Sequence, residues 1–346
     1  MIVMHTQATI PQFHVVPGIV VKGILTELRE QTIEIVASTY LAHERGETVN
    51  PDSLFLRFPN DPASRIIALP AAIVAPGDAQ AVSGIKWIGS YPENIKSGIP
   101  RASAVIILND PRNGYPCALL EGALISAVRT AASAVLGARW LNAKQKNVSC
   151  LSFVGGGVIA RNILETFIAD CWRLSSVTIH DIDQASAGAL AAFAQQSGFR
   201  DVRVVCLEEA VAADIVVFCT TANGPYVFGS GVFRAGQVVL NISLRDLAPE
   251  IIAAGYNFFD DIGHCLKANT SPHLAEQKYG NRDFVTGTLA AVMRGDIQLY
   301  RDKPLIYSPF GMGILDLALG KIVHELAVGR GLAIAIPAFF GEECRW

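Results

Sequence analysis

The stretch Ser152-Phe153-Val154-Gly155-Gly156-Gly157-Val158-Ile159-Ala160 decides the fold class of this 346-residue chain. It follows an apolar run, and apolar residues then recur at the spacing of one helix face, at Ile159, Ile163, Phe167 and Cys171. A glycine turn of the form G-x-G-x-x-A between a strand and a helix is typical of a dinucleotide-binding site. We therefore predict a tight turn at Gly155, close phosphate approach at Gly157 and close helix–strand packing at Ala160.

The residues around this turn predict the cofactor. Free N–H groups at the start of the helix favour anions, so we expect Gly156, Val158 and Ile159 to lie against the pyrophosphate. The next apolar run ends at Asp181, 24 residues after Gly157, where a carboxylate accepts hydrogen bonds from both ribose hydroxyls. No Arg or Lys follows directly, which favours NAD over NADP. The alternative is a glycine turn and a surface Asp that bind no ligand.

Short apolar runs alternate with helical stretches such as 185–196 throughout the second half of the chain. The predicted strands are 148–154, 177–179, 202–205, 215–219, 238–241, 258–259 and 305–307. This alternation predicts an α/β fold, with a Rossmann-type doubly wound parallel sheet over residues 141–307. Thr220, Thr221 and Ala222 follow one strand, where they either line the dinucleotide crevice or form an ordinary loop.

The first 140 residues have a different pattern. We expect a helix over 26–43 and strands over 54–58, 66–75, 81–88 and 104–109, with a hairpin turn at Asn109-Asp-Pro-Arg-Asn-Gly114. Further helices are expected over 125–141 and 311–332. The interpretation is an α+β substrate-binding and dimerisation domain over 1–140, to which residues 308–346 return.

Composition excludes several classes of protein. Apolar residues make up 51% of the chain and the net charge is −3, which does not favour nucleic acid. No apolar run approaches the ~18 residues that span a bilayer, and the segment from Met1 to Gln7 lacks a secretory pattern, so we expect a cytoplasmic protein without membrane contact. The seven cysteines, Cys344 among them, are odd in number and contain no C-x-x-C pair. We interpret them as reduced thiols and predict no metal site.

Three basic residues stand in apolar surroundings: Arg57 in Leu-Phe-Leu-Arg-Phe, Lys86 in Gly-Ile-Lys-Trp, and Arg129 in Ala-Val-Arg-Thr. Charges in such positions are rarely left unpaired. Together they could hold a substrate carboxylate. For each residue alone, a structural role with a buried stem and a solvated head is the alternative.

Longer motifs resemble the ornithine cyclodeaminase/μ-crystallin family over nearly the whole chain. These motifs are Gly84-Ile-Lys-Trp87, Leu119-Leu-Glu-Gly122, Ser126-Ala-Val-Arg-Thr-Ala-Ala-Ser-Ala134, Val154-Gly-Gly-Gly-Val-Ile-Ala160 and Pro309-Phe-Gly-Met-Gly-Ile-Leu-Asp316. The resemblance implies an NAD-dependent enzyme that acts on an amino-acid-like small molecule, and a homodimer joined through the first domain.

The resemblance also implies roles for individual residues. The substrate-carboxylate positions are Arg57, Lys86 and Arg129, and Lys86 is also catalytic. The cofactor positions are Arg129, Thr130, Gly155, Gly156, Gly157, Val158, Ile159, Asp181, Thr220, Thr221, Ala222, Ser243 and Gly311. Asp246 is the candidate acid–base residue, although the cyclodeaminases have Asp followed by Pro-Gly-Lys in this loop and this chain has Asn241-Ile-Ser-Leu-Arg-Asp246. Arg101 is a candidate for holding an extra carboxylate.

Within the family, the chain is most similar to the dehydrogenases of 2,3-diaminopropionate biosynthesis, through Ile99-Pro-Arg-Ala-Ser103, Ile242-Ser-Leu-Arg-Asp246 and Asp260-Asp-Ile-Gly-His264. This implies oxidative hydrolysis of N-(2-amino-2-carboxyethyl)-L-glutamate to 2-oxoglutarate and 2,3-diaminopropionate, for a siderophore or an antibiotic. The alternatives are ornithine cyclodeamination, alanine dehydrogenation or ketimine reduction. A non-catalytic, crystallin-like NAD(P)-binding protein is the alternative of another class.

Overall fold

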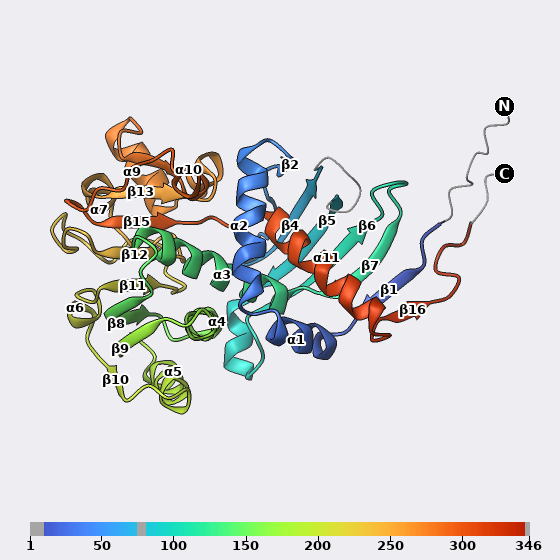
Figure 1. The fold of residues 1–346 in the computed structure, drawn as a ribbon, viewed down its shortest axis with the longest axis horizontal. Helices are drawn as coiled ribbons and strands as arrows, with labels where there is room; N and C mark the ends of the chain where they lie inside the picture. Colours follow the sequence, from blue (N-terminus) through green and yellow to red (C-terminus); the bar gives the residue numbers. More distant parts are fainter. Residues whose placement is uncertain (1–9, 75–80, 343–346) are drawn as a thin grey trace. The chain divides into compact units, whose positions relative to one another are not determined.

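The structure is a computed structural model that describes residues 10–74 and 81–342. The segment from Met1 to Gln7, Ala75 and Cys344, which entered the sequence predictions, lie outside the described residues. The chain divides into two compact units (Figure 1). Unit 1 contains the described residues of 1–28, 45–126 and 312–346, and unit 2 contains 29–44 and 127–311.

Unit 2 is built on a parallel sheet with the strand order β10-β9-β8-β11-β12-β15-β13-β14. Its strands are β8 (Asn147–Val154), β9 (Arg173–His180), β10 (Asp201–Val204), β11 (Ile215–Phe218), β12 (Val238–Asn241), β13 (Tyr256–Phe259), β14 (Val285–Thr288) and β15 (Leu305–Ser308). The chain builds outward from β8 on one side through β9 and on the other through β11, so the prediction of a doubly wound Rossmann-type sheet is confirmed. All seven predicted strands are present, and β14 is additional.

Helices separate most of these strands along the chain, and α2 (Gln31–Glu44) and α3 (Ala123–Leu141) precede the first of them. The others are α4 (Val158–Ala169), α5 (Gln184–Gln196), α6 (Leu207–Ala210), α7 (Pro249–Ala254), α8 (Ile262–Cys265), α9 (Ser271–Tyr279) and α10 (Leu289–Arg294). The predicted helices over 125–141 and 185–196 correspond to α3 and α5. From residue 127 onward α3 belongs to unit 2.

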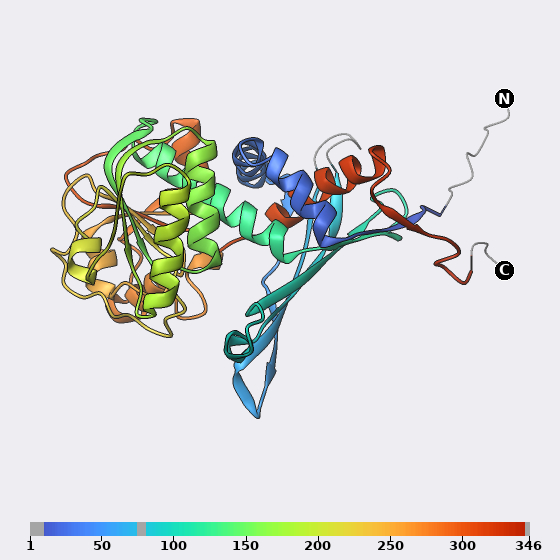
Figure 2. The same cartoon turned by 90° about the horizontal axis from the view of Figure 1, so that it is seen from below.

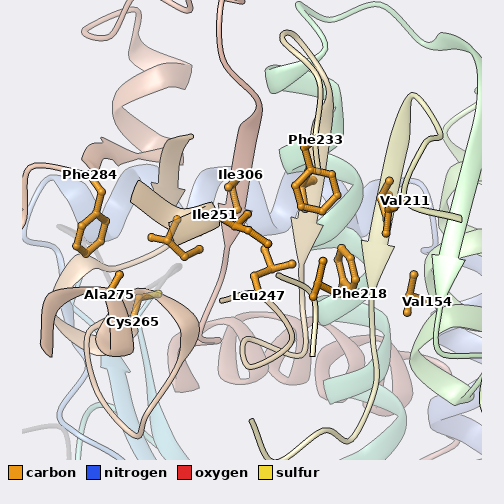
Figure 3. Packing of buried hydrophobic residues seen from close by; sticks show 14 of the residues in the cluster. Val154, Val211, Phe218, Phe233, Leu247, Ile251, Cys265, Ala275, Phe284 and Ile306 are labelled. Carbon is orange, nitrogen blue, oxygen red and sulfur yellow. The ribbon is translucent and has the colours of Figure 1, made fainter. Parts of the chain in front are cut away.

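One apolar cluster of unit 2 packs against β8, β11, β12, β13 and β15 (Figure 3). Phe218 of β11 meets Phe233 edge to face, with 6.1 Å between ring centroids. Val154, the last residue of β8, is 1% exposed in this cluster. The buried end of β8 therefore holds the start of the glycine turn in place.

Unit 1 is built on a largely antiparallel sheet, β16-β1-β7-β6-β5-β4-β2, with β3 paired to β4. Its elements are β1 (Phe13–Val16), β2 (Thr48–Val49), β3 (Leu54–Phe58), β4 (Asp61–Ile73), β5 (Val82–Ser90), β6 (Ala102–Asn109), β7 (Pro116–Glu121), β16 (Ile334–Ile336), α1 (Gly18–Glu27), α11 (Gly313–Gly329) and the short 3-10 helix η1 (Pro92–Ser97). The predicted hairpin joins β6 to β7, where the Asp110 N–H donates to the Tyr115 carbonyl at 2.8 Å. The expected helix over 311–332 is α11, and β1, β2 and β16 were not predicted.

The predicted helix over 26–43 is wrong. The chain forms α1, which ends at Glu27, and a separate helix α2, which begins at Gln31. The apolar spacing continues across the break, but α1 groups with unit 1 and α2 with unit 2. Between them, Arg29 donates to Glu165 of unit 2 at 2.6 Å. One periodic apolar pattern thus supplies buried residues to the cores of both units. The period alone does not show where the helix breaks.

The two faces of the unit 1 sheet differ in burial. Lys86 lies opposite Ile106 and on the same face, and these residues are 2% and 0% exposed. Helices α1 and α11 lie on one side of this sheet (Figure 2). Trp87 lies opposite Val105 on the other face and is 43% exposed. The sheet therefore has one covered face that carries Lys86 and one largely apolar face that is open within unit 1.

A close contact in unit 2 makes a stability prediction. A Cβ atom on Gly137 of α3 would lie 2.4 Å from the ring of the fully buried Tyr307. We expect Gly137→Ala to lower the free energy of unfolding by about 1–3 kcal/mol through overpacking. Gly188 of α5 has open space around it, so Gly188→Ala should instead raise it by about 0.5–1 kcal/mol. Urea unfolding of both variants tests this, and equal effects of the two changes would contradict it.

Candidate active site

The glycine turn after β8 is sterically constrained at two positions. Gly155 has a φ of 100°, and a Cβ atom there would lie 2.6 Å from the carbonyl oxygen of Cys219. A Cβ atom on Gly156 would lie 2.7 Å from the carbonyl oxygen of Ser186. The turn therefore passes between two backbone segments that leave no room for a side chain.

The third glycine faces open space. A Cβ atom on Gly157 would have nothing within 4 Å, and Gly157 is the N-cap of α4 without a side-chain hydrogen bond to the free N–H groups. Val158 follows with 66% exposure, Ile159 is half-buried, and Ala160 is fully buried. Open space before uncapped helix N–H groups fits a pyrophosphate.

Asp181 follows the last residue of β9 directly and is tied to the glycine turn. Its Oδ2 atom accepts from the Gly156 N–H at 2.6 Å, and its Oδ1 atom accepts from the Asp183 N–H at 2.9 Å. Asp183 in turn caps α5 through the N–H groups of Ala185 and Ser186. The carboxylate is half-buried beside the place where a dinucleotide ribose lies in this fold. The residues present therefore fit NAD.

Asp246 lies in the loop after β12 and is fully buried. Its Oδ1 atom accepts from the hydroxyls of Thr220 at 2.5 Å and Tyr226 at 2.9 Å, and its Oδ2 atom accepts from the Ser243 hydroxyl. Burial and the charge of Asp246 raise the pKa of Tyr226 well above its ordinary value. Tyr226 was not among the predicted site residues.

This network limits what Asp246 can do. Both carboxylate oxygens are engaged and the side chain has no exposed surface, so direct contact with a substrate would require rearrangement. Its hydroxyl donors lie closer to the surface: Thr220 and Ser243 are half-buried. Of the other predicted residues here, Thr221 is exposed, and the Ala222 N–H donates to the Thr220 hydroxyl at 3.2 Å. The geometry thus favours Asp246 as a group that acts through Thr220 and Ser243.

A second cluster of unit 2 surrounds Arg129 of α3. Gly311 has a φ of 91°, and a Cβ atom there would lie 2.7 Å from Nη1 of the buried Arg129. Asp260 holds this loop, because its carboxylate accepts from the N–H groups of Phe310 at 2.9 Å and Gly311 at 2.7 Å. Thr130 is half-buried on the same helix. The structure therefore brings Arg129 and Gly311 together, as two predicted cofactor positions, and adds Asp260.

Unit 1 carries the other predicted cations. The Nζ atom of Lys86 donates to Asp316 of α11 at 2.6 Å and to the Ser126 hydroxyl at 3.1 Å. Asp316 is fully buried, and it was quoted in a family motif without a site role. Arg57 is exposed on β3 above the Phe55 ring, and the half-buried Arg101 donates to the Ser90 hydroxyl at 2.8 Å. Lys86 is thus an ion-paired buried cation, whereas Arg57 and Arg101 have no ion-pair partner among the described residues.

Within residues 10–74 and 81–342, no group of three or more His, Cys, Asp or Glu side chains is arranged to hold a metal ion. The six cysteines of these ranges are free thiols. None of the helices in this part of the chain is long and apolar enough to cross a membrane.

The fold and the glycine turn define a class: a Rossmann-type, dinucleotide-dependent enzyme. A model of the ornithine cyclodeaminase/mu-crystallin family matches residues 20–331. The chain belongs to that family, as its motifs predict.

Individual relatives are oxidoreductases. The chain is 31% identical over 323 residues to the N-((2S)-2-amino-2-carboxyethyl)-L-glutamate dehydrogenase of Staphylococcus aureus, with 89% of this chain and 93% of that protein covered. It is 25% identical to the alanine dehydrogenase of Archaeoglobus fulgidus, with coverage of 90% and 94%. Among solved structures, the Thermococcus litoralis Delta(1)-pyrroline-2-carboxylate reductase in complex with NADH and L-proline is similar in fold, with a TM-score of 0.85 at 22% identity, covering 94% of this chain and all of that one.

The contact between Asp181 and the glycine turn makes a prediction about cofactor choice. We expect Asp181→Arg to raise the Kd for NADH at least about tenfold and to shift preference toward NADPH, because a cation replaces the ribose acceptor. Fluorescence titration with both reduced cofactors measures this. Asp201→Arg, the same charge change at the exposed start of β10, should leave both affinities unaltered. Unchanged NADH affinity in Asp181→Arg would remove the ribose role.

Proposed function

We propose that this protein is an NAD-dependent oxidoreductase that oxidises the α-carbon of a secondary amine, N-(2-amino-2-carboxyethyl)-L-glutamate, and releases 2-oxoglutarate and 2,3-diaminopropionate. The observation that carries the proposal is the buried Lys86–Asp316 pair on a sheet face that also bears arginines. The similarity to the Staphylococcus aureus dehydrogenase over 89% of the chain supports the choice of substrate. The product would serve siderophore or antibiotic biosynthesis.

Substrate binding begins with a carboxylate. Asp316 compensates the charge of the buried Lys86, and hydrogen bonds to Asp316 and Ser126 position its ammonium group, which we assign to the recognition of a substrate carboxylate. Fixing the carboxylate orients the α-hydrogen, which lowers the barrier through positioning.

When bound, NAD supplies the hydride acceptor for the α-hydrogen. The chain must remove a proton from the ammonium form of the substrate, because a protonated amine cannot support hydride loss. The Thr220 and Ser243 hydroxyls each donate to Asp246, so one of them can pass this proton to the carboxylate. Asp246 is thus the proposed proton acceptor, acting through a hydroxyl.

The remaining steps consume one water. Loss of hydride and proton leaves a C=N bond between the former glutamyl α-carbon and the amine nitrogen. Water adds to that carbon, and the C–N bond of the carbinolamine then breaks as the nitrogen takes a proton. The carbon becomes the ketone of 2-oxoglutarate, and the nitrogen leaves on 2,3-diaminopropionate.

We also propose a homodimer joined through the open face of the unit 1 sheet. On this face Trp87 is 43% and Leu54 is 64% exposed, and both flank Ala68 in the strand register. Ile85 and Val105 of the same face are half-buried. An apolar sheet face of this kind is typical of a subunit interface. A cytoplasmic location stays a prediction.

The reaction is tested by incubating the protein with NAD and one candidate substrate at a time: N-(2-amino-2-carboxyethyl)-L-glutamate, alanine or ornithine. We expect the first to give equal amounts of NADH, 2-oxoglutarate and 2,3-diaminopropionate. Product analysis must accompany absorbance, because ornithine cyclisation gives proline and ammonia without net NADH. Absence of 2-oxoglutarate with the first substrate would refute the assignment.

Lys86 has a structural role and a proposed functional role, and two variants distinguish them. Lys86→Ala removes the cation that is paired with the buried Asp316 carboxylate, so we expect it to lower the free energy of unfolding by about 3–5 kcal/mol. Lys86→Met combined with Asp316→Asn removes both charges and should keep most of the stability while turnover falls at least 100-fold. Thermal unfolding and the NADH assay measure the two effects. Normal turnover in the double variant would exclude Lys86 from the site.

The interface predicts the effect of one surface charge. We expect Trp87→Glu to convert the dimer into a monomer, because an ionised carboxylate cannot be buried there without a partner. Light scattering after gel filtration measures the mass. Ile182→Glu, at a 96% exposed residue of unit 2, is the control and should remain dimeric. A monomeric wild-type protein would contradict the proposal.

A further inference from the structure

Three arginines lie together at one end of the unit 1 sheet. Arg57 of β3 is directly opposite Arg65 of β4, and Arg65 is directly opposite Ser90 of β5. Directly opposite residues point to the same face of a sheet. Arg101, just before β6, donates to the Ser90 hydroxyl at 2.8 Å, so its guanidinium also lies there. The strand register thus gathers three cations around Ser90.

This arginine cluster (Arg57, Arg65 and Arg101) shares a face with Lys86. Lys86 and Ser90 are four positions apart on β5, and alternate residues of a strand point to the same side. Their backbone positions are about 13 Å apart along the strand. Because Lys and Arg side chains are long, their charged groups can lie closer together than these backbone positions. One extended ligand could therefore contact both Lys86 and the arginine cluster.

The cluster lacks a compensating acid. None of its three members forms an ion pair with Asp or Glu among the described residues, and the Arg65 Nε atom is buried without a hydrogen-bond partner. Burial and the charge of Arg57 lower the pKa of Arg65, and burial and the charge of Arg65 lower the pKa of Arg101. Partly buried cations that repel one another and leave a donor unused favour an anionic ligand.

We infer that Arg65 and Arg101, with Arg57 beside them, bind a second carboxylate of the substrate, distinct from the carboxylate at Lys86. A guanidinium presents paired N–H donors that match a carboxylate, and Arg65 still has one donor to offer. The substrate class is therefore an amino acid with an additional carboxylate, such as a glutamyl γ-carboxylate, and not a simple monocarboxylic amino acid. This inference deepens the proposed function and rests on it for the reaction.

Binding of unreactive acids tests the site without catalysis. Glutarate and pentanoate have the same five-carbon chain and differ by one carboxylate, so calorimetric titration of the full-length protein with NAD present compares them directly. We expect glutarate to bind at least tenfold more tightly than pentanoate. Arg65→Gln combined with Arg101→Gln should abolish that difference, whereas Arg45→Gln, an exposed arginine paired with Glu47, should keep it.

Thermal stability distinguishes a purely structural role of the arginines from ligand binding. If the arginines served only the fold, their removal would lower the Tm. The inferred role instead predicts an equal or higher Tm without ligand, because two mutually repelling charges are gone. Arg65→Lys keeps the charge without the paired donors and should recover only part of the glutarate affinity. Unchanged glutarate preference in the double variant, or a lowered Tm with full preference, overturns the inference.

Kinetics separates this inference from the proposed function. With N-(2-amino-2-carboxyethyl)-L-glutamate, the double variant should show a KM raised at least tenfold and a smaller change in kcat. If wild-type protein does not oxidise this amine but its glutarate preference depends on Arg65 and Arg101, the reaction is wrong and the carboxylate site stands. If the amine is oxidised equally by wild type and double variant, the reaction stands and the site is wrong.

Discussion

A buried ion pair between Lys86 and Asp316 is the interaction on which the site of unit 1 depends. Both side chains are almost without exposed surface, and their atoms are 2.6 Å apart although the residues are 230 positions apart in the chain. Breaking such a pair leaves a charge buried in low dielectric, at a cost of about 3–5 kcal/mol. Strand β5 and helix α11 must therefore meet before the buried Lys86 is compensated, and the covered face of the unit 1 sheet is formed by the same contact.

Unit 2 depends on a steric constraint of a different kind. Gly155 and Gly156 pass between the backbone at Cys219 and Ser186, and Asp181 accepts the Gly156 N–H. The same turn therefore packs closely against the segments at the end of β11 and in α5, and the uncapped N–H groups of α4 face open space. The glycine turn is inseparable from the packing around it, since a side chain at Gly155 would displace the backbone at Cys219 and one at Gly156 would displace the backbone at Ser186.

Local chemistry determines how well the sequence pattern predicts each helix and strand. The central strands of unit 2 were predicted because each is a continuous apolar run, which is typical of buried parallel strands. Strand β14, Val-Thr-Gly-Thr, has no such run and is half-buried throughout. The break between α1 and α2 was missed because the helical spacing continues while the two helices join different units. Strands β1 and β16 are short, and they are recognisable as strands only by their pairing, β1 with both β7 and β16.

The amino-acid sequence by itself determined the doubly wound fold, the glycine turn, the position of Asp181 at the end of a strand, and the family. Each of these depends on residues that are close together in the chain and on backbone sterics. Tertiary structure alone decided that Asp316 compensates Lys86, that Asp246 is enclosed by Thr220, Tyr226 and Ser243, and that Arg65 joins Arg101 around Ser90. Charge compensation requires a partner in space, and the partner's place is set by strand register and helix packing. No local pattern encodes that distance.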